Sequence, residues 1–177
     1  KWTLDGSLFR STSFEDANIV EESDIISVEN INQTAATHED ENNMMIQSDF
    51  ILPLGKKGKA EFGVKGNLRE INNDYLVHED TGAGNWITLA NLDNQMIYTE
   101  NIFAAYAMAG NKSGKISYQA GIRLEYSEII TDFKRTNEIN ARDYMNLFPS
   151  VNLSYEFKKN QFIQSSYSKR ISRPRHW

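Results

Sequence analysis

A stretch near the middle of the chain alternates regularly between apolar and polar residues. The apolar residues of KISYQAGIRLEY (115–126) share one parity, which runs from Ile116 to Tyr126, whereas Arg123 and Glu125 lie on the other. A period of two is that of a β-strand with two different faces. One face of this strand therefore needs an apolar environment, and the other needs water or polar partners.

The length of this alternation separates two possible environments. Strands of soluble proteins usually have about five or six residues, whereas a tilted strand that crosses a membrane has about nine to eleven. The alternation from Lys115 to Ser127 has the greater length. It favours a transmembrane barrel strand with its apolar face on lipid. The alternative is a soluble all-β binding or adhesion module whose apolar face covers a core.

Similar two-faced segments recur along the chain, and an acidic segment of less certain structure, residues 15–43, follows the first of them. Within this acidic segment, DIISVENINQ (24–33) is also compatible with a strand. Besides 115–127, we expect strands at Trp2 to Phe14, Met44 to Leu54, Lys59 to Glu70, Gln95 to Ala109, Tyr144 to Phe157 and Gln161 to Ser172.

The connections between these segments alternate between short and long. GKKGK (55–59), NKSG (111–114) and KKN (158–160) are short turns, whereas about 72–94 and 129–143 are long polar connections. Outer-membrane barrels have short periplasmic turns and long extracellular loops. The pattern therefore predicts an all-β fold, an antiparallel up-and-down transmembrane β-barrel segment of about seven or eight strands. Its lysine-rich turns would face the periplasm.

The composition excludes several classes of protein. The chain has no cysteine, which rules out disulfides and thiolate metal sites. Its formal net charge of -5 argues against a nucleic-acid partner, which would require a concentrated basic surface. No run approaches the roughly eighteen apolar residues of a membrane helix. The low mean hydropathy suits strands that are only half apolar.

Several segments resemble successive barrel strands of TonB-dependent receptors, in particular the outer-membrane β-barrel family common in Bacteroidetes. The resemblance extends from about Gln47 to Trp177 and is carried by QSDFILPLGKKGKAEFGVKG, ENIFAAYAMA, KISYQAGIRLEY, YMNLFPSVNLSYEF and QSSYSKRISRPRHW. It implies a barrel of about 22 strands closed by a plug domain. Residues 1–177 would then be a partial outer-membrane β-barrel domain that contains neither the plug nor the TonB box.

The same resemblance implies the partners of the chain. They would be outer-membrane lipid, the plug domain of the same receptor, TonB acting through that plug, and a small nutrient ligand such as a siderophore, a metal complex or a glycan. The location would be the bacterial outer membrane. A small eight-stranded outer-membrane barrel is a further alternative, but Arg173, Pro174 and Arg175 interrupt the alternation expected of its last strand.

The candidate functional residues are polar side chains on the predicted lumen face and one aromatic side chain in a loop. The lumen residues would contact the plug or an anionic substrate, or form a hydrogen-bonded ladder that stiffens the wall. Trp86, in the connection 72–94, would stack on a ligand or pack within its loop. The lumen-facing candidates are Arg69, Arg123, Glu125, Glu156 and Arg170.

Aromatic and acidic residues complete the prediction. Tyrosines at intervals indicate interface girdles, in which the ring lies at headgroup depth. The two runs that begin at His38 and His78 lack the spacing of a metal site, so no metal and no cofactor is expected. No catalytic arrangement is present either, and the chain is predicted not to be an enzyme. The girdle candidates are Tyr98, Tyr106, Tyr118, Tyr126, Tyr155 and Tyr167.

Overall fold

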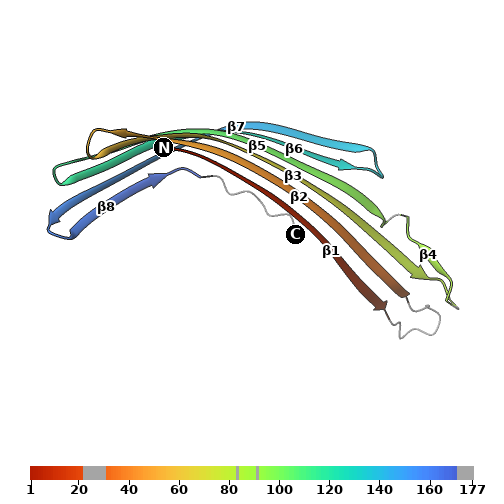
Figure 1. The fold of residues 1–177 in the computed structure, drawn as a ribbon. Coiled ribbons are helices and arrows are strands. Elements are labelled where there is room, and N and C mark those ends of the chain that lie inside the picture. The colour runs from red at the N-terminus through yellow and green to blue at the C-terminus, as the bar shows by residue number, and fades with distance from the viewer. Residues whose placement is uncertain (22–30, 83, 91, 171–177) are drawn as a thin grey trace.

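The chain forms one antiparallel β-sheet that bends into an open trough (Figure 1). The computed structural model describes residues 1–21, 31–82, 84–90 and 92–170. The predicted all-β antiparallel fold is confirmed by the pairing of the strands. The strands are β1 (Trp2–Glu21), β2 (Ile31–Leu54), β3 (Gly58–Asp80), β4 (Trp86–Thr88), β5 (Asn94–Ser113), β6 (Ile116–Phe133), β7 (Glu138–Lys158) and β8 (Gln161–Ser168).

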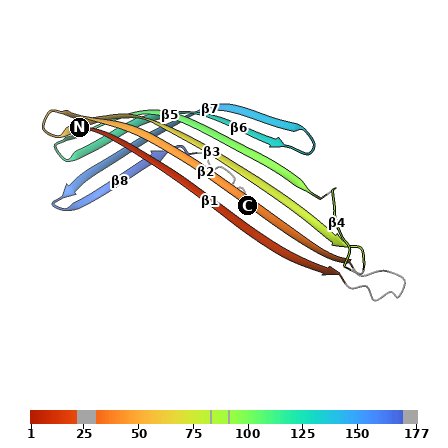
Figure 2. The ribbon, with the colours of Figure 1, turned by 45° about the vertical axis from the view of Figure 1, so that its right-hand side comes forward.

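The strands follow one another in an up-and-down order. The sheet runs β1-β2-β3-β5-β6-β7-β8, and the short β4 pairs only with the far end of β3. Within the described residues, β1 and β8 do not pair with each other, and no second layer of structure covers the sheet (Figures 1 and 2). This arrangement disagrees with the alternative of a small barrel that closes on itself.

The convex face of the sheet is apolar and uncovered. Ile122 and Leu124 are 48% and 42% exposed, although their residue types normally lie in a protein core. Strand pairing continues this surface across the sheet, because Leu124 lies in register with Ala105 on β5 and Leu147 on β7. The soluble-module alternative requires a second sheet over these side chains, and the structure places none there among the residues it describes.

The apolar surface has the height of a membrane. On β6 it extends from Ile116 to Tyr126. Eleven residues at about 3.3 Å each, tilted by about 40°, span about 28 Å, close to the apolar band of about 25 Å on outer-membrane barrels. Above it the convex face becomes polar along a row that shifts by two residues between β3 and β5. Arg10, Asn42 and Glu70 are in register on β1, β2 and β3, and Asn101, Glu128 and Asp143 are in register on β5, β6 and β7.

The strands continue beyond this polar row, and here the predicted connections were wrong. Much of the acidic segment 15–43 belongs to β1 and β2, and most of 72–94 belongs to β3, β4 and β5. The connection 129–143 shrinks to residues 134–137 between β6 and β7. The convex face of these extensions is largely polar, whereas their concave face buries Ala35, Ile71, Val77 and Tyr98. The alternation of a strand with an apolar lipid-facing side is therefore absent there.

Two other predictions fall partly outside the described residues. Of the possible strand 24–33, residues 24–30 lie outside them, and only 31–33 belong to β2. The predicted strand 161–172 ends at Ser168, and residues 171 and 172 lie outside the described part. Among the described residues, no helix is long and apolar enough to cross a membrane.

A charge on the convex face is expected to destabilise the protein in a bilayer. Ile122→Arg places a guanidinium near the middle of the apolar band, so the free energy of unfolding should fall by about 2–4 kcal/mol. Equilibrium denaturant unfolding of the full-length protein in lipid vesicles measures this. The matched control is Gln119→Arg on the concave face of the same strand, which should cost less than about 1 kcal/mol. Equal losses would contradict the assignment of the two faces.

Candidate functional site on the concave face

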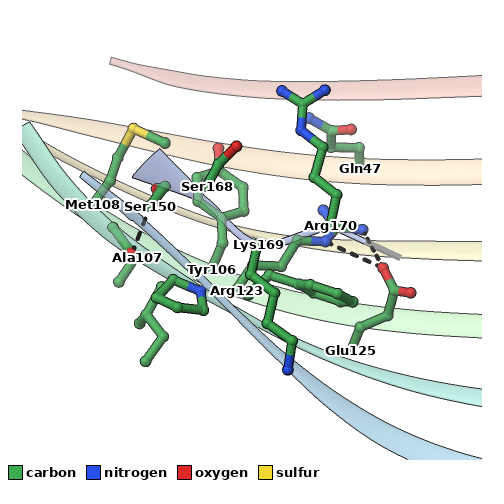
Figure 3. A pocket seen from close by; sticks show the side chains of 14 residues that line it. Gln47, Tyr106, Ala107, Met108, Arg123, Glu125, Ser150, Ser168, Lys169 and Arg170 are labelled. Atoms are coloured by element: carbon green, nitrogen blue, oxygen red, sulfur yellow. Dashed lines mark hydrogen bonds and ion pairs between the residues drawn. The ribbon is translucent and has the colours of Figure 1, made fainter. Parts of the chain in front are cut away.

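Polar side chains from several strands meet in a hollow on the concave face (Figure 3). Alternation along each strand directs one set of side chains inward, and the curvature of the sheet brings these sets together. The hollow has a volume of about 550 Å³ and is lined by residues from β2, β5, β6, β7 and β8 and by the two residues that follow β8. Its polar lining includes Gln47, Tyr106, Arg123, Glu125, Ser150, Ser168, Lys169 and Arg170.

An ion pair on β6 forms one side of this hollow. Arg123 and Glu125 are two residues apart and therefore project from the same face. Two guanidinium nitrogens of Arg123 donate to Glu125 Oε2, Nη2 at 3.0 Å and Nε at 3.2 Å. Glu125 is only 5% exposed, whereas the Arg123 side chain remains 36% exposed. The pair thus presents part of a fixed cationic group to the hollow.

A second polar contact crosses an entire strand. The Tyr106 hydroxyl on β5 donates to Asp49 Oδ1 on β2 at 2.5 Å, and β3 lies between the two strands. Gln47 Nε2 donates to the other carboxylate oxygen of Asp49 at 2.7 Å. The contact is possible because Gly63 is the β3 residue in register with both Asp49 and Tyr106. With no side chain at Gly63, the tyrosine ring lies over the backbone of β3.

Neighbouring atoms leave no room for a side chain at Gly63. A Cβ atom built there would lie 2.7 Å from Tyr106 Cε1 and 2.8 Å from the Ser48 carbonyl oxygen. By contrast, a Cβ atom on Gly66, on the opposite face of the same strand, would meet nothing closer than 3.6 Å. The crowding therefore belongs to the concave face, where three adjacent strands are held together by one hydrogen-bonded side chain.

A separate polar cluster lies nearer the long-loop end of the trough. Arg69 Nε on β3 donates to Glu41 Oε1 on β2 at 2.6 Å. Glu100 on β5 lies in register with Arg69 and is buried. Further along, Gln33 Nε2 donates to Glu79 Oε2 at 2.6 Å. These bonds couple neighbouring strands in the region where the convex face has become polar.

The five predicted lumen residues all lie on the concave face, but only some of them lie together. Arg123, Glu125 and Arg170 line the same hollow, and Arg170 is exposed. Arg69 belongs to the cluster described above. Glu156 lies near the short-turn end, where its Oε2 accepts a hydrogen bond from Lys112 Nζ at 3.2 Å. The site is thus a row of linked polar groups along the trough.

The predicted aromatic residues divide into two groups. Tyr118, Tyr126, Tyr155 and Tyr167 are exposed on the convex face, as expected of a girdle. Tyr98 and Tyr106 do not belong to it, because they lie on the concave parity of β5, and Tyr98 is only 4% exposed. The strand ENIFAAYAMA is apolar on both parities, so its alternation could not assign a face.

Trp86 lies in the short strand β4 rather than in an irregular loop. It is in register with Asp80 at the end of β3 and is 46% exposed. The neighbouring Thr88 Oγ1 lies 3.1 Å from His78 Nδ1, which ties β4 to β3. A role for Trp86 in ligand stacking stays a prediction.

The two histidine-led runs belong to regular strands. They lie in β2 and β3, so successive side chains point to opposite faces. Phe14 stacks on His38 at a ring distance of 4.4 Å on the convex side, whereas Glu41 pairs with Arg69 on the concave side. Across residues 1–21, 31–82, 84–90 and 92–170, no group of three or more metal-ligating side chains is found.

The residues that sequence reasoning missed are Asp49, Gly63 and Gln47. The sequence shows only that Asp49 occupies one of the polar positions of its strand. Nothing in the sequence distinguishes Gly63 from other glycines in strands. A glycine between an aspartate strand and a tyrosine strand becomes informative only when the register is known, since the register puts the three residues on one line.

Solved structures with a similar fold are membrane receptors and transporters. The unliganded ferric citrate transporter FecA matches with a TM-score of 0.61 at 12% identity, over 93% of this chain and 24% of that one. The FpvAI–pyocin S2 complex matches with a TM-score of 0.59 at 12% identity, over 94% of this chain and 24% of that one. The ferric yersiniabactin uptake receptor FyuA from Yersinia pestis matches with a TM-score of 0.52 at 8% identity, over 93% of this chain and 25% of that one. The chain spans about a quarter of the length of these proteins.

Sequence comparison agrees with the fold. The model of the outer membrane protein beta-barrel family matches residues 1–177. No curated protein sequence gave a match. The narrower resemblance to receptors of the Bacteroidetes type stays a prediction.

Substitution of Gly63 is expected to disrupt the contact between β2 and β5. In Gly63→Ala the new methyl group overlaps Tyr106 and the β2 backbone, so the free energy of unfolding should fall by about 1–3 kcal/mol. Gly66→Ala is the matched control, and it should leave stability unchanged or raise it by up to about 1 kcal/mol. Denaturant unfolding in vesicles measures both. A Gly63→Ala protein as stable as the Gly66→Ala protein would contradict the role of the close approach.

Proposed function

The chain belongs to the outer membrane protein beta-barrel family, and from this premise we propose that it forms part of the wall of a TonB-dependent receptor that takes up a small nutrient. Its location is the bacterial outer membrane. The observation that carries the proposal is the single curved sheet with two different faces. The convex face offers lipid an apolar band, and the concave face carries hydrogen-bonded polar groups suited to a water-filled lumen.

The concave face is proposed to guide the nutrient and to contact the plug domain. Glu125 orients Arg123 by two hydrogen bonds while the guanidinium stays partly exposed. Arg170 lines the same hollow from the end of β8. Two arginines beside one buried carboxylate suit an anionic group, because guanidinium forms paired hydrogen bonds with carboxylates. The proposed occupant is therefore an anionic plug side chain or an anionic nutrient.

Other parts of the trough have supporting roles in this proposal. Arg69 with Glu41, and Glu156 with Lys112, stiffen the wall above and below the hollow. Trp86 lies on β4, at the long-loop end, where a nutrient from outside the cell would arrive. TonB would act through the plug rather than through this chain. The proposal contains no catalytic step and requires no cofactor.

Iron chelates are the first nutrients to test. Two of the proteins of similar fold are described as a ferric citrate transporter and a ferric yersiniabactin uptake receptor. Citrate is an anion, which agrees with the arginines of the hollow. A strain without the full-length protein should lose growth on one such chelate as its iron source, and plasmid-borne protein should restore it. Normal growth of the deletion strain on every nutrient class tested would contradict the transport role.

Loss of the Arg123 charge is expected to reduce uptake. Arg123→Gln removes a charged hydrogen-bond donor from the hollow, so uptake of the labelled nutrient should fall by about tenfold. The control is Arg10→Gln, which removes an arginine from the convex face and should leave uptake unchanged. Immunoblots of outer-membrane fractions establish equal amounts of both variants. Unchanged uptake by Arg123→Gln would refute the assigned role of the hollow.

A further inference from the structure

Lysines collect at one end of the sheet, at its three short hairpin turns. The turn between β2 and β3, the turn between β5 and β6 and the turn between β7 and β8 all lie at this end. We call these residues the lysine rim: Lys56, Lys57, Lys59, Lys112, Lys115, Lys158 and Lys159. The opposite end of the sheet is mainly acidic, so the charge of the molecule is strongly polarised along its strands.

The lysine rim adjoins the apolar band directly. Lys115 precedes Ile116, Lys158 follows Phe157, and Lys56 follows Leu54 by two residues. At about 3.3 Å per strand residue, these backbones lie within about 7 Å of the last apolar side chain. A lysine side chain can extend along such a surface and hold its ammonium group in the polar layer. The rim therefore lies at the depth of lipid headgroups.

Exposed aromatic side chains support this depth. Tyr118 and Tyr155 lie on the convex face close to the turns and are 48% and 43% exposed. Aromatic rings of this kind are enriched where the hydrocarbon of a membrane meets its headgroups. The ammonium groups of the turns lie just beyond these rings.

Within the lysine rim, the lysines that have carboxylate partners among the described residues are two inward-pointing ones. Lys59 pairs with Glu61 at 2.5 Å, and Lys112 pairs with Glu156 at 3.2 Å, both on the concave parity. In the part of the chain that the structure describes, no carboxylate oxygen lies within 4.0 Å of the ammonium group of Lys56, Lys57, Lys158 or Lys159. The lysines at the turn tips thus keep uncompensated charge next to the lipid-facing surface.

We propose that the turn-tip lysines bind the phosphate groups of anionic phospholipids in the leaflet that surrounds the short turns. This inference rests on the proposed membrane location and orientation, in which that leaflet is the periplasmic one. Positive side chains near a membrane surface attract anionic lipids. The lysines are spread along the rim of three hairpins, as a row of separate lipid headgroups requires. Lys56 and Lys57 also line a hollow together with Lys59 and Lys112, whereas Lys158 and Lys159 do not line it. An acidic peptide bound in that hollow would therefore leave Lys158 and Lys159 without a partner.

The test uses the full-length protein in vesicles of phosphatidylethanolamine that contain a small fraction of spin-labelled phosphatidylglycerol. Electron paramagnetic resonance measures the lipid immobilised on the protein. We expect phosphatidylglycerol to be enriched over spin-labelled phosphatidylethanolamine, and the enrichment to fall as salt screens the charges. The combined variant Lys56→Gln, Lys57→Gln, Lys158→Gln and Lys159→Gln should reduce the relative affinity for phosphatidylglycerol by about tenfold.

Two control variants separate this effect from a general loss of charge or fold. The same four lysines changed to arginine keep their charge and should keep the enrichment. A double variant at the acidic end, Lys134→Gln with Arg135→Gln, should also leave it unchanged. Because the substituted side chains lie at exposed turns, insertion of the protein into vesicles should be normal in all variants.

The outcomes distinguish the inference from the function on which it rests. A protein that fails to insert into vesicles overturns the membrane location itself. A protein that inserts but shows no enrichment, or keeps it in the glutamine variant, overturns only the lipid site. Displacement of the labelled lipid by inorganic phosphate, beyond an equal ionic strength of chloride, would assign the lysines to free phosphate instead. Binding of an acidic periplasmic peptide without lipid enrichment would assign them to a protein partner.

Discussion

The constraint on which this structure depends is the absence of water in the hydrocarbon core of a membrane. Each backbone N–H and C=O group at that depth must find its partner within the protein. The long ladders between neighbouring strands meet this demand, since β2 and β3 pair from Gln33 with Glu79 to Leu54 with Gly58. Once the backbone is satisfied by the sheet, each face is free to match a different environment.

The concave face shows how the sheet is held in its curved form. Arg123 with Glu125 links positions along one strand, whereas Tyr106 with Asp49 links strands on either side of β3. Gly63 makes the second link possible by leaving room for an aromatic ring. Polar groups of the concave face therefore hold the wall together, so substitutions there alter its stability.

The central part of the fold could be predicted from the sequence. One face of each strand there lies on lipid, so apolar and polar residues alternate along the strand. Strand β6 is the clearest case, from Ile116 to Tyr126. The extensions of β1, β2 and β3 were not predicted, since their convex face is largely polar and buried apolar residues such as Ile71 and Val77 lie on the opposite face. Tyr106 was misplaced because β5 is apolar on both faces. Arg123 and Glu125 were found by parity, but Asp49 became visible only through the register.

The polar extensions also bear on how the sheet assembles. A strand with one apolar face cannot shift its register by one residue without turning that face away from lipid. Beyond the row from Arg10 to Asp143 the penalty from lipid is missing, and side chains buried on the concave face, such as Val77 and Tyr98, oppose a shift of register instead. The outer stretches therefore keep their register through burial within the protein, whereas the stretches below them keep theirs through contact with lipid.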